Sequence, residues 1–565
     1  MLIHYLPKLL ADRGSSIDGF ECSGLVAGAV FVDVPSRKMP PKDLSFSVYA
    51  DVDLEGSEDF VERRHCDFET ALEYSKVGKF QWLLLTISGV VYATCAISST
   101  ALSFVLPSAG CDFALTSADK GKLTAISLVG MLLGCGVWGS IADSQGRKVA
   151  VMLSLLMDFF AAALSSAAQN FDVFLVCRFF NGFGIIGATS IVFPYLGEFL
   201  SNGDRDRYLG RLEVFWNFGI IILPGVAWCL LSKNMVDLYA PSVTLSPWRI
   251  FVLVCSLPSL ISYVLIYYLP ETPKYLMDHG KYEKAKMVFQ KMYAFNTGRP
   301  METYPVRRLE GEAIHQTTCK MRKKPAGYSL WRSVGNVAER VRALASQQYL
   351  KYLAITCFAD FGLMASYYTL VLWFPEIFER FNLYETRHPD KTAGICAVSQ
   401  IRPTRPSRPG QCNFTIGNTV FLETLVIALS CLPTSASLSC FMHKFGKKFV
   451  LVFGLILSGL SALALDLVQN STQTLLVSSV FESLTSVLEA VLLCVVVDLF
   501  PTNLRALALS LTVTCGRLGA IFGNVTFGLL LDLNCVVPIY LFGIFLIGSG
   551  VLCLAIPRSD GYAPM

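Results

Sequence analysis

The chain has 565 residues, of which 53% are hydrophobic and only 16% are charged. Soluble domains carry about 25% charged residues, so this composition excludes an ordinary soluble domain. The net charge of +4 is too small to favour a nucleic-acid partner. No Cys/His spacing predicts a metal site, and no Walker phosphate loop predicts an ATP-driven pump. We therefore expect neither an enzyme nor a cofactor.

The apolar residues are grouped in blocks, and each block reaches the ~20 residues that a helix needs to cross a bilayer. We predict twelve spanning helices, six before and six after a long polar stretch. In chain order they lie at 81–106, 122–142, 149–168, 173–199, 210–231, 248–269, 350–374, 416–439, 447–467, 473–498, 506–531 and 535–556.

This pattern predicts an all-α membrane protein built from two six-helix bundles. The basic residues of the short loops fall on one side, which the positive-inside rule assigns to the cytosol together with both termini. The predicted units are a cytosolic tail (1–80), a first bundle (81–269), a cytosolic linker (270–349), a second bundle (350–556) with an outside loop at 375–415, and a short cytosolic tail (557–565).

Two loops carry local signals. In the linker, Ala285, Val288, Phe289 and Met292 recur at helical spacing among lysines, which predicts an amphipathic helix over 281–294 near the membrane face.

The outside loop contains two cysteines, Cys396 and Cys412, and the sequon Asn413-Phe414-Thr415. If it faces an oxidising compartment, the cysteines are a candidate disulfide and Asn413 is a candidate glycosylation site.

The two halves share residues at a constant offset of 300. Gly146 is matched by Gly446, Glu198 by Asp498, Arg205 by Arg505 and Gly219 by Gly519, whereas Asp143 is matched by His443. Agreement across separate loops and helices indicates a duplicated six-helix unit, which is how transporters with a site near the midplane are built.

The segment Gly139-Ser140-Ile141-Ala142-Asp143-Ser144-Gln145-Gly146-Arg147-Lys148 resembles the loop signature of the major facilitator superfamily. PYLGE at 194–198 and PETPKY at 270–275 resemble its sugar-porter branch. Within that branch, SFVLPSAGCDF at 103–113 and SYYTLVLWFPEIF at 366–378 are similar to synaptic vesicle glycoprotein 2 and related proteins. The chain departs from these relatives where they carry first-helix acids, because Cys95 and Ser98 stand there instead.

The resemblance implies a gate at the cytosolic loops. Charged groups there would pair in one conformation and separate in the other, which stabilises whichever state makes the pair. Anchoring of helix ends at the headgroup layer is the alternative. The expected gating residues are Asp143, Gly146, Arg147, Lys148, Glu198, Arg205, Asp498 and Arg505.

The resemblance also implies a substrate cavity between the bundles. Intramembrane charges are costly and usually face a cavity or a partner. The first helix holds no charged residue, so either transport is uncoupled or another acid, for which we favour Asp360, pairs with Arg178. Asp158, Glu423 and Glu482 are further intramembrane acids. The expected cavity residues are Arg178, Trp216, Asp360, Tyr367, Tyr368 and Glu489.

We therefore expect a secondary transporter that moves a small sugar-like solute or an organic cation by alternating access, with proton coupling left open. The alternative is a transporter-shaped vesicle protein that regulates secretion or binds partners and moves nothing. A plasma membrane or a secretory or synaptic vesicle membrane would suit either function.

Overall fold

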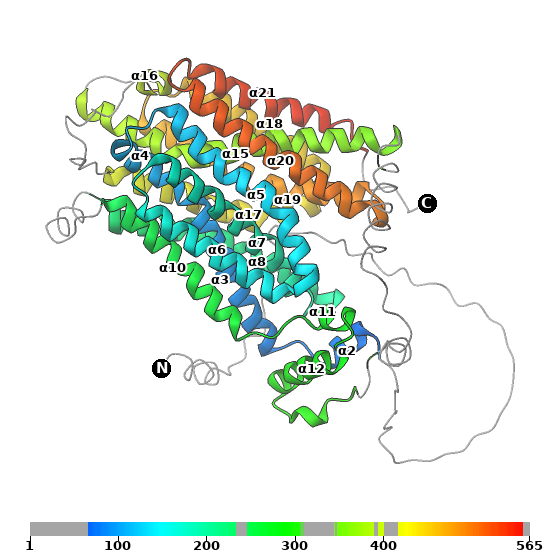
Figure 1. Ribbon diagram of the computed structural model, residues 1–565. Helices are drawn as coiled ribbons and strands as arrows, with labels where there is room; N and C mark the ends of the chain where they lie inside the picture. The colour runs from blue at the N-terminus through cyan, green and yellow to red at the C-terminus, as the bar shows by residue number, and fades with distance from the viewer. Residues whose placement is uncertain are drawn as a thin grey trace, which may run out of the picture.

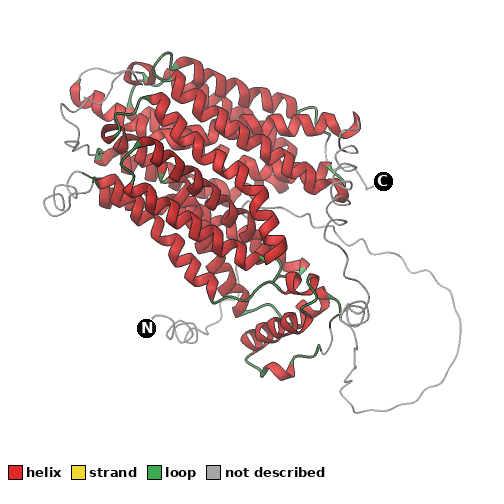
Figure 2. Cartoon of the chain, in the orientation of Figure 1, coloured by secondary structure: helices red, strands yellow, loops and turns green. Residues whose placement is uncertain are grey.

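The computed structural model describes residues 66–232, 246–306, 309, 344, 347–388, 394–399 and 416–557. Within these residues every named element is a helix (Figure 2). The predicted positions Cys412 and Asn413, and most of the two tails and of the linker, lie outside the described residues.

Twelve helical segments of the described chain are long and apolar enough to cross a membrane, and they form two bundles of six (Figure 1). The first bundle comprises α3 (Lys79–Thr100) continued by α4 (Leu102–Asp112), α5 (Ser117–Gln145), α6 (Arg147–Ala167), α7 (Phe171–Gly197), α8 (Asn202–Leu231) and α10 (Pro247–Tyr267). The second comprises α15 (Gln347–Arg387), α17 (Asn418–Phe445), α18 (Lys447–Ala464) extended by η3 (Leu465–Leu467), α19 (Ser471–Leu499), α20 (Thr502–Leu530) and α21 (Val536–Cys553).

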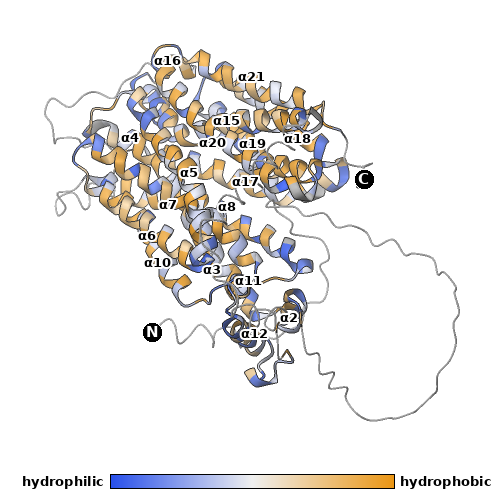
Figure 3. Cartoon of the chain, turned by 45° about the vertical axis from the view of Figure 1, so that its right-hand side comes forward, coloured by the Kyte–Doolittle hydropathy of each residue, from blue (hydrophilic) through white to orange (hydrophobic). Residues whose placement is uncertain are grey.

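Hydrophobic residues, coloured orange in Figure 3, predominate along the helices of both bundles, and large apolar side chains are exposed on the outer faces. Leu164 on α6 is 62% exposed, Ile261 on α10 56%, Phe453 on α18 55% and Ile544 on α21 61%. A soluble protein rarely exposes so much contiguous apolar surface. This surface fits a surrounding of lipid chains, and the protein is a multi-pass membrane protein.

One helix runs further than the sequence predicted. The structure continues α15 through Pro375 to Arg387, whereas hydropathy predicted its end at residue 374 and placed residues 375–387 in the outside loop. Glu376 and Arg380 lower the local hydropathy, but both are buried and paired with other charges. The helix therefore tolerates them inside the bundle.

A small helical layer covers one end of the first bundle (Figure 1). It consists of α2 (Phe68–Tyr74), α11 (Pro273–Asp278) and α12 (Tyr282–Thr297), and we name this end of the molecule the linker end. The predicted amphipathic helix is confirmed, because α12 buries Ala285, Val288, Phe289 and Met292. Its apolar face packs on α2, where the rings of Phe68 and Phe289 lie 6.0 Å apart.

The internal repeat is visible in the backbone. Gly146 (φ +112°) and Gly446 (φ +85°) occupy equivalent turns between helices, in a region of φ that favours glycine. Directly after each turn, Lys148 and Lys448 donate through Nζ to a backbone carbonyl at the end of α10 and just beyond α21, respectively. The two bundles are therefore copies of one unit, as the 300-residue offset predicted.

The predicted disulfide partner of Cys396 was wrong. Cys396, in α16 (Ile395–Ser399), is bonded to Cys535 in the turn between α20 and α21, with the two Cα atoms 5.3 Å apart. The sequence suggested Cys412 because both cysteines lie in the predicted outside loop. Disulfide formation depends instead on which Cβ atoms the fold brings together, and packing of α16 near this turn selects Cys535.

We expect mass spectrometry of the non-reduced protein to find a peptide pair linking Cys396 and Cys535. Cys535→Ser should abolish that pair, and removal of the crosslink should lower the thermal unfolding midpoint because the unfolded chain regains loop entropy. Cys412→Ser is the matched control and should leave the pair in place. A Cys396–Cys412 peptide pair in the wild type would contradict this assignment.

Candidate functional site

The two bundles are joined by buried charges at the end opposite to the linker end, which we name the α4 end. Lys120 at the start of α5 donates to Glu376 on α15 at 2.6 Å, and these side chains are only 5% and 3% exposed. Arg380, one turn further along α15, donates to the same carboxylate at 3.1 Å. Because Lys120 and Glu376 belong to different bundles, this pair holds the bundles together.

Asp532 and Ser117 extend this network. The Ser117 hydroxyl donates to Asp532 at 2.7 Å and accepts from Arg380 at 3.1 Å, and Arg380 lies 3.7 Å from the Asp532 carboxylate. We name the set of Ser117, Lys120, Glu376, Arg380 and Asp532 the α4-end lock. Two cations and two carboxylates balance inside it, as buried charges require.

Close backbone packing lies directly beneath the α4-end lock. A Cβ atom on Gly121 of α5 would lie 2.8 Å from the Asn524 carbonyl oxygen and 2.9 Å from the Gly528 Cα of α20. Only glycine permits this approach. Further toward the middle, Asn217 on α8 donates to the Ser435 hydroxyl on α17 at 3.4 Å. The two bundles are therefore in contact from the α4 end to about the middle of α8 and α17.

At the linker end, the predicted gating charges pair within their own bundles. Arg147 contacts Asp143 at 2.6 Å and Glu198 at 3.4 Å, all in the first bundle. Lys447 contacts Asp498 at 2.8 Å in the second bundle. The two sets are equivalent under the repeat, and among the described residues neither forms an ion pair with the other bundle.

The remaining predicted gating residues also lie at the linker end. Arg205 donates to the Gly197 carbonyl at 3.1 Å and lies 3.7 Å from Glu69 of α2. Arg505, its counterpart in the second bundle, has a buried Nε that finds no hydrogen-bond partner among the described residues.

Several predicted cavity residues gather around Arg517 on α20, which the sequence reasoning did not select. Its guanidinium donates to the Tyr368 hydroxyl at 2.7 Å and lies over the ring of the same tyrosine. Asp360 and Glu489 lie within electrostatic range of this guanidinium. Neither oxygen of Asp360 has a hydrogen-bond partner in the described structure. The rings of Tyr367 and Tyr368 lie 5.3 Å apart.

Across from this cluster, the first bundle contributes an aromatic and acidic group. Tyr92 on α3 donates to Glu213 on α8 at 3.3 Å, and its ring lies 5.0 Å from that of Trp216. Glu213 is within electrostatic range of Glu489 on α19. Trp216 therefore packs on the tyrosine that binds Glu213, and Glu213 is a carboxyl that the sequence did not predict.

Arg178 lies apart from these groups, inside the first bundle. It donates to Asn181 at 3.2 Å, and its Nε and Nη2 atoms have no partner among the described residues. Asn181 in turn donates to Asp158 on α6 at 2.5 Å. Asp158 also accepts from Ser98 at 2.8 Å, so a carboxyl from α6 lies beside the first-helix position where the resembling proteins carry an acid.

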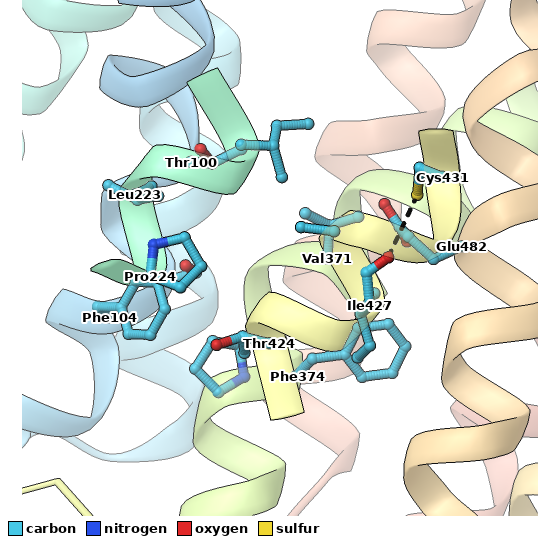
Figure 4. A pocket seen from close by; sticks show the side chains of 14 residues that line it. Thr100, Phe104, Leu223, Pro224, Val371, Phe374, Thr424, Ile427, Cys431 and Glu482 are labelled. Carbon is cyan, nitrogen blue, oxygen red and sulfur yellow. Dashed lines mark hydrogen bonds between the residues drawn. The ribbon is translucent and has the colours of Figure 1, made fainter. Parts of the chain in front are cut away.

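A pocket lies between the two bundles on the α4 side of the Arg517 cluster (Figure 4). Glu482 is its single ionisable carboxyl, and none of the six predicted cavity residues lines it. It is lined by Thr100, Ser103, Phe104, Ile220, Leu223 and Pro224 of the first bundle and by Val371, Phe374, Pro375, Thr424, Ile427, Ala428, Cys431 and Glu482 of the second.

Both bundles match models of known transporter families. Residues 82–304 match the family model described as "Sugar (and other) transporter", and residues 416–564 match the model of the "Major Facilitator Superfamily". The chain belongs to the major facilitator superfamily. In this superfamily the two bundles face each other across a central site, which is where the pocket and the Arg517 cluster lie.

Superfamily relatives with similar sequences include synaptic vesicle glycoproteins. Synaptic vesicle glycoprotein 2B of Mus musculus is 25% identical over 90% of this chain and 88% of its own length. Synaptic vesicle glycoprotein 2C of Homo sapiens is 25% identical over 88% of this chain and 82% of its own length. The chain is therefore similar to these proteins over nearly its whole length.

Solved transporter structures share the fold. The partially occluded inward open conformation of the xylose transporter XylE from E. coli matches with a TM-score of 0.60 and 15% identity, covering 86% of this chain and 99% of that chain. The nucleoside transporter NupG matches with a TM-score of 0.55 and 11% identity, covering 84% and 98%. The family and the fold are those of membrane transporters and not of enzymes.

The superfamily signature points to the loop charges of the linker end, and it gave no signal for the α4-end lock. In the sequence, Lys120 is indistinguishable from an ordinary loop lysine, and Glu376 and Arg380 fall in the predicted outside loop at 375–415. Arg517 follows a polar stretch within an otherwise apolar helix, formed by Thr512, Thr514 and Cys515. Its charge inside a spanning segment was the one signal that could have identified it.

No group of three or more potential ligands in the described chain could hold a metal ion.

Proposed function

We propose that this protein is a secondary transporter that carries a small organic solute by alternating access. The observation that carries the proposal is the unequal contact between the bundles. Buried charges join them at the α4 end, whereas the charges of the linker end pair within each bundle. This arrangement is one end state of a two-state rocking motion, with the central site reachable from the linker end.

The proposed opposite state exchanges these contacts. The α4-end lock separates, and the linker-end residues Arg147, Glu198, Lys447 and Asp498 approach across the bundle interface. Glycines at the crossing of α5 and α20 allow the two backbones to meet closely and part again. A solute shifts the equilibrium between the two states only through its different affinity for each of them.

The proposed orientation places the linker end and both termini in the cytosol, in agreement with the basic residues of its short loops. In this orientation the Cys396–Cys535 disulfide faces the outside of the cell or the vesicle lumen, where disulfides persist. A plasma membrane and a secretory or synaptic vesicle membrane both satisfy this arrangement.

Proton coupling has a structural candidate. Asp158 is buried with Ser98, Asn181 and Ser259 around it, and Arg178 is one hydrogen-bonded residue away. Asp360 is a second buried carboxyl, in electrostatic range of Arg517. Either carboxyl is placed to carry a proton during the proposed cycle. Uptake measured with and without a pH gradient distinguishes proton-coupled transport from uniport.

Uptake into proteoliposomes, with and without an imposed pH gradient, tests the proposal. We expect at least one solute from a panel of sugars, organic cations and amino acids to accumulate faster than in protein-free liposomes. Asp143→Asn should lower that rate because, in the proposed opposite state, the charges around Arg147 hold the two bundles together at the linker end. Asp466→Asn, a charge at the other end of the second bundle, should leave uptake unchanged. Absence of uptake for every solute would contradict transport.

A specific observation favours a second candidate function. The first spanning segment (79–110) carries no charged residue beyond Lys79 at its linker end, and the curated relatives are named as synaptic vesicle glycoproteins. A non-transporting vesicle protein that regulates secretion or binds partners would fit both facts. Such a protein would show no uptake, and Asp143→Asn would alter no solute-dependent signal.

A further inference from the structure

We infer that the pocket between the bundles binds a small amphipathic organic cation, with its protonated amine against Glu482 and its apolar body against the surrounding walls. This inference rests on the proposed function only for movement of the ligand across the membrane. Binding itself follows from the pocket and can be measured separately.

The carboxyl of Glu482 is the first observation. Its residue is 5% exposed on α19, and Oε2 has no hydrogen-bond partner among the described residues. A buried polar atom without a partner costs free energy, so a donor that reaches Oε2 from the pocket is favoured. Figure 4 places the side chain beside Cys431 and Val371 at the second-bundle wall.

The charge balance around Glu482 is the second observation. No lysine or arginine is among the residues that line the pocket. The guanidinium of Arg517 is engaged with Tyr368 and lies in range of Asp360 and Glu489. The described inter-bundle region thus contains more carboxyls than cations, and a cationic group on the ligand would balance the excess.

The walls select against a polyhydroxyl ligand. Apart from Glu482, they present hydrophobic side chains and two prolines, with polar groups limited to the hydroxyls of Thr100, Ser103 and Thr424 and the thiol of Cys431. The Thr100 and Thr424 hydroxyls already donate to carbonyls of their own helices. A sugar would bury several hydroxyls without partners, each at a cost. Of the two solute classes that the sequence left open, the pocket favours the organic cation.

Phenyl rings add to this preference. Phe104 lies on the first-bundle wall and Phe374 on the second-bundle wall, so both sides can contact an apolar body. Aromatic faces also attract cations. The matching chemistry is one protonated amine attached to a compact hydrocarbon or aromatic group.

Direct binding to the purified full-length protein in nanodiscs tests the inference, with three probes. Phenethylamine has the inferred chemistry, phenethyl alcohol is its neutral counterpart, and D-glucose is the polyhydroxyl. We expect phenethylamine to bind at least tenfold more tightly than either of the others. Equal affinity for the amine and the alcohol, or no binding of the amine, would overturn the inference.

Glu482→Gln should weaken phenethylamine binding about 10- to 100-fold, because a charge-assisted hydrogen bond is lost while the shape is kept. The matched control is Glu423→Gln on α17, an intramembrane carboxyl that does not line the pocket and accepts from Ser471. It should bind the amine as the wild type does. Unchanged binding in Glu482→Gln, or an equal loss in the control, would overturn the inference.

Ala428→Leu provides a second variant if Glu482→Gln unfolds. Ala428 lines the pocket and is 4% exposed, so the larger side chain should fill the pocket and abolish binding without changing any charge. Uptake separates this inference from transport. Glu482-dependent binding of the amine without uptake of any solute would support the binding inference and contradict transport. Uptake of another solute without binding of the amine would support transport and overturn the binding inference.

Discussion

Replacing Lys120 with glutamate should open the α4 end. The change leaves Glu376 facing a like charge in a site where both side chains are nearly fully buried. Loss of one partner from a buried ion pair costs about 3–5 kcal/mol, so the equilibrium should shift away from the locked state by two orders of magnitude or more. Hydrogen–deuterium exchange should rise in residues 117–128 and 524–530, the segments of α5 and α20 that meet at this end.

Lys122→Glu is the matched control for this prediction. Lys122 lies two residues further along α5, but its side chain is 60% exposed and pairs with Asp119 in the same helix. Exposed pairs contribute little, so exchange should remain as in the wild type. If Lys120→Glu leaves exchange in both segments unchanged while the protein stays folded, the α4-end lock does not hold the bundles together.

Gly528→Leu should block closure at the same end by steric means. A Cβ atom at this position would lie 2.6 Å from the Gly121 Cα and 2.7 Å from the Ser117 carbonyl oxygen. These are backbone atoms that cannot rotate away, so the bundles must separate there. We expect uptake of any transported solute to fall to background, with raised exchange at the start of α5 and a retained helical circular dichroism spectrum.

Gly136→Leu tests whether the effect is specific to the helix crossing. Gly136 is on α5 as well, but a Cβ atom there has no neighbour within 4 Å. Its variant should keep wild-type uptake and exchange. Wild-type uptake in Gly528→Leu would mean that α5 and α20 do not need to meet during the cycle.

The repeat and the linker-end charges were accessible from sequence because they are local. A glycine turn followed by Arg147 or Lys447 is a short motif, and its recurrence 300 residues later needs no knowledge of packing. The structure shows these residues in equivalent turns, with the partners Glu198 and Asp498 each 51 positions further along. Hydropathy likewise identified the twelve spans, since crossing a bilayer demands long apolar helices.

The α4-end lock and the Arg517 cluster depend on contacts that no local pattern encodes. Lys120 and Glu376 are 256 residues apart, and each reads by itself as a solvated loop charge. The same limit explains the incorrect disulfide, since Cys396 pairs with a cysteine 139 positions away. Hydropathy treats a charge as a sign that a helix has ended. A charge neutralised by a residue of another helix is compatible with a continuing helix, as in α15.

The disulfide between Cys396 and Cys535 connects α16 to the turn between α20 and α21 in the same bundle. It does not bridge the interface between the two bundles, so it is compatible with the proposed rigid-body motion of one bundle against the other. The covalent bond instead restrains the second bundle internally. Reduction should make that bundle more flexible while the contacts between the two bundles remain. In the proposed orientation, reducing agents applied from the outside or the lumen should therefore change the rigidity of the second bundle, while the contacts that define each proposed end state stay the same.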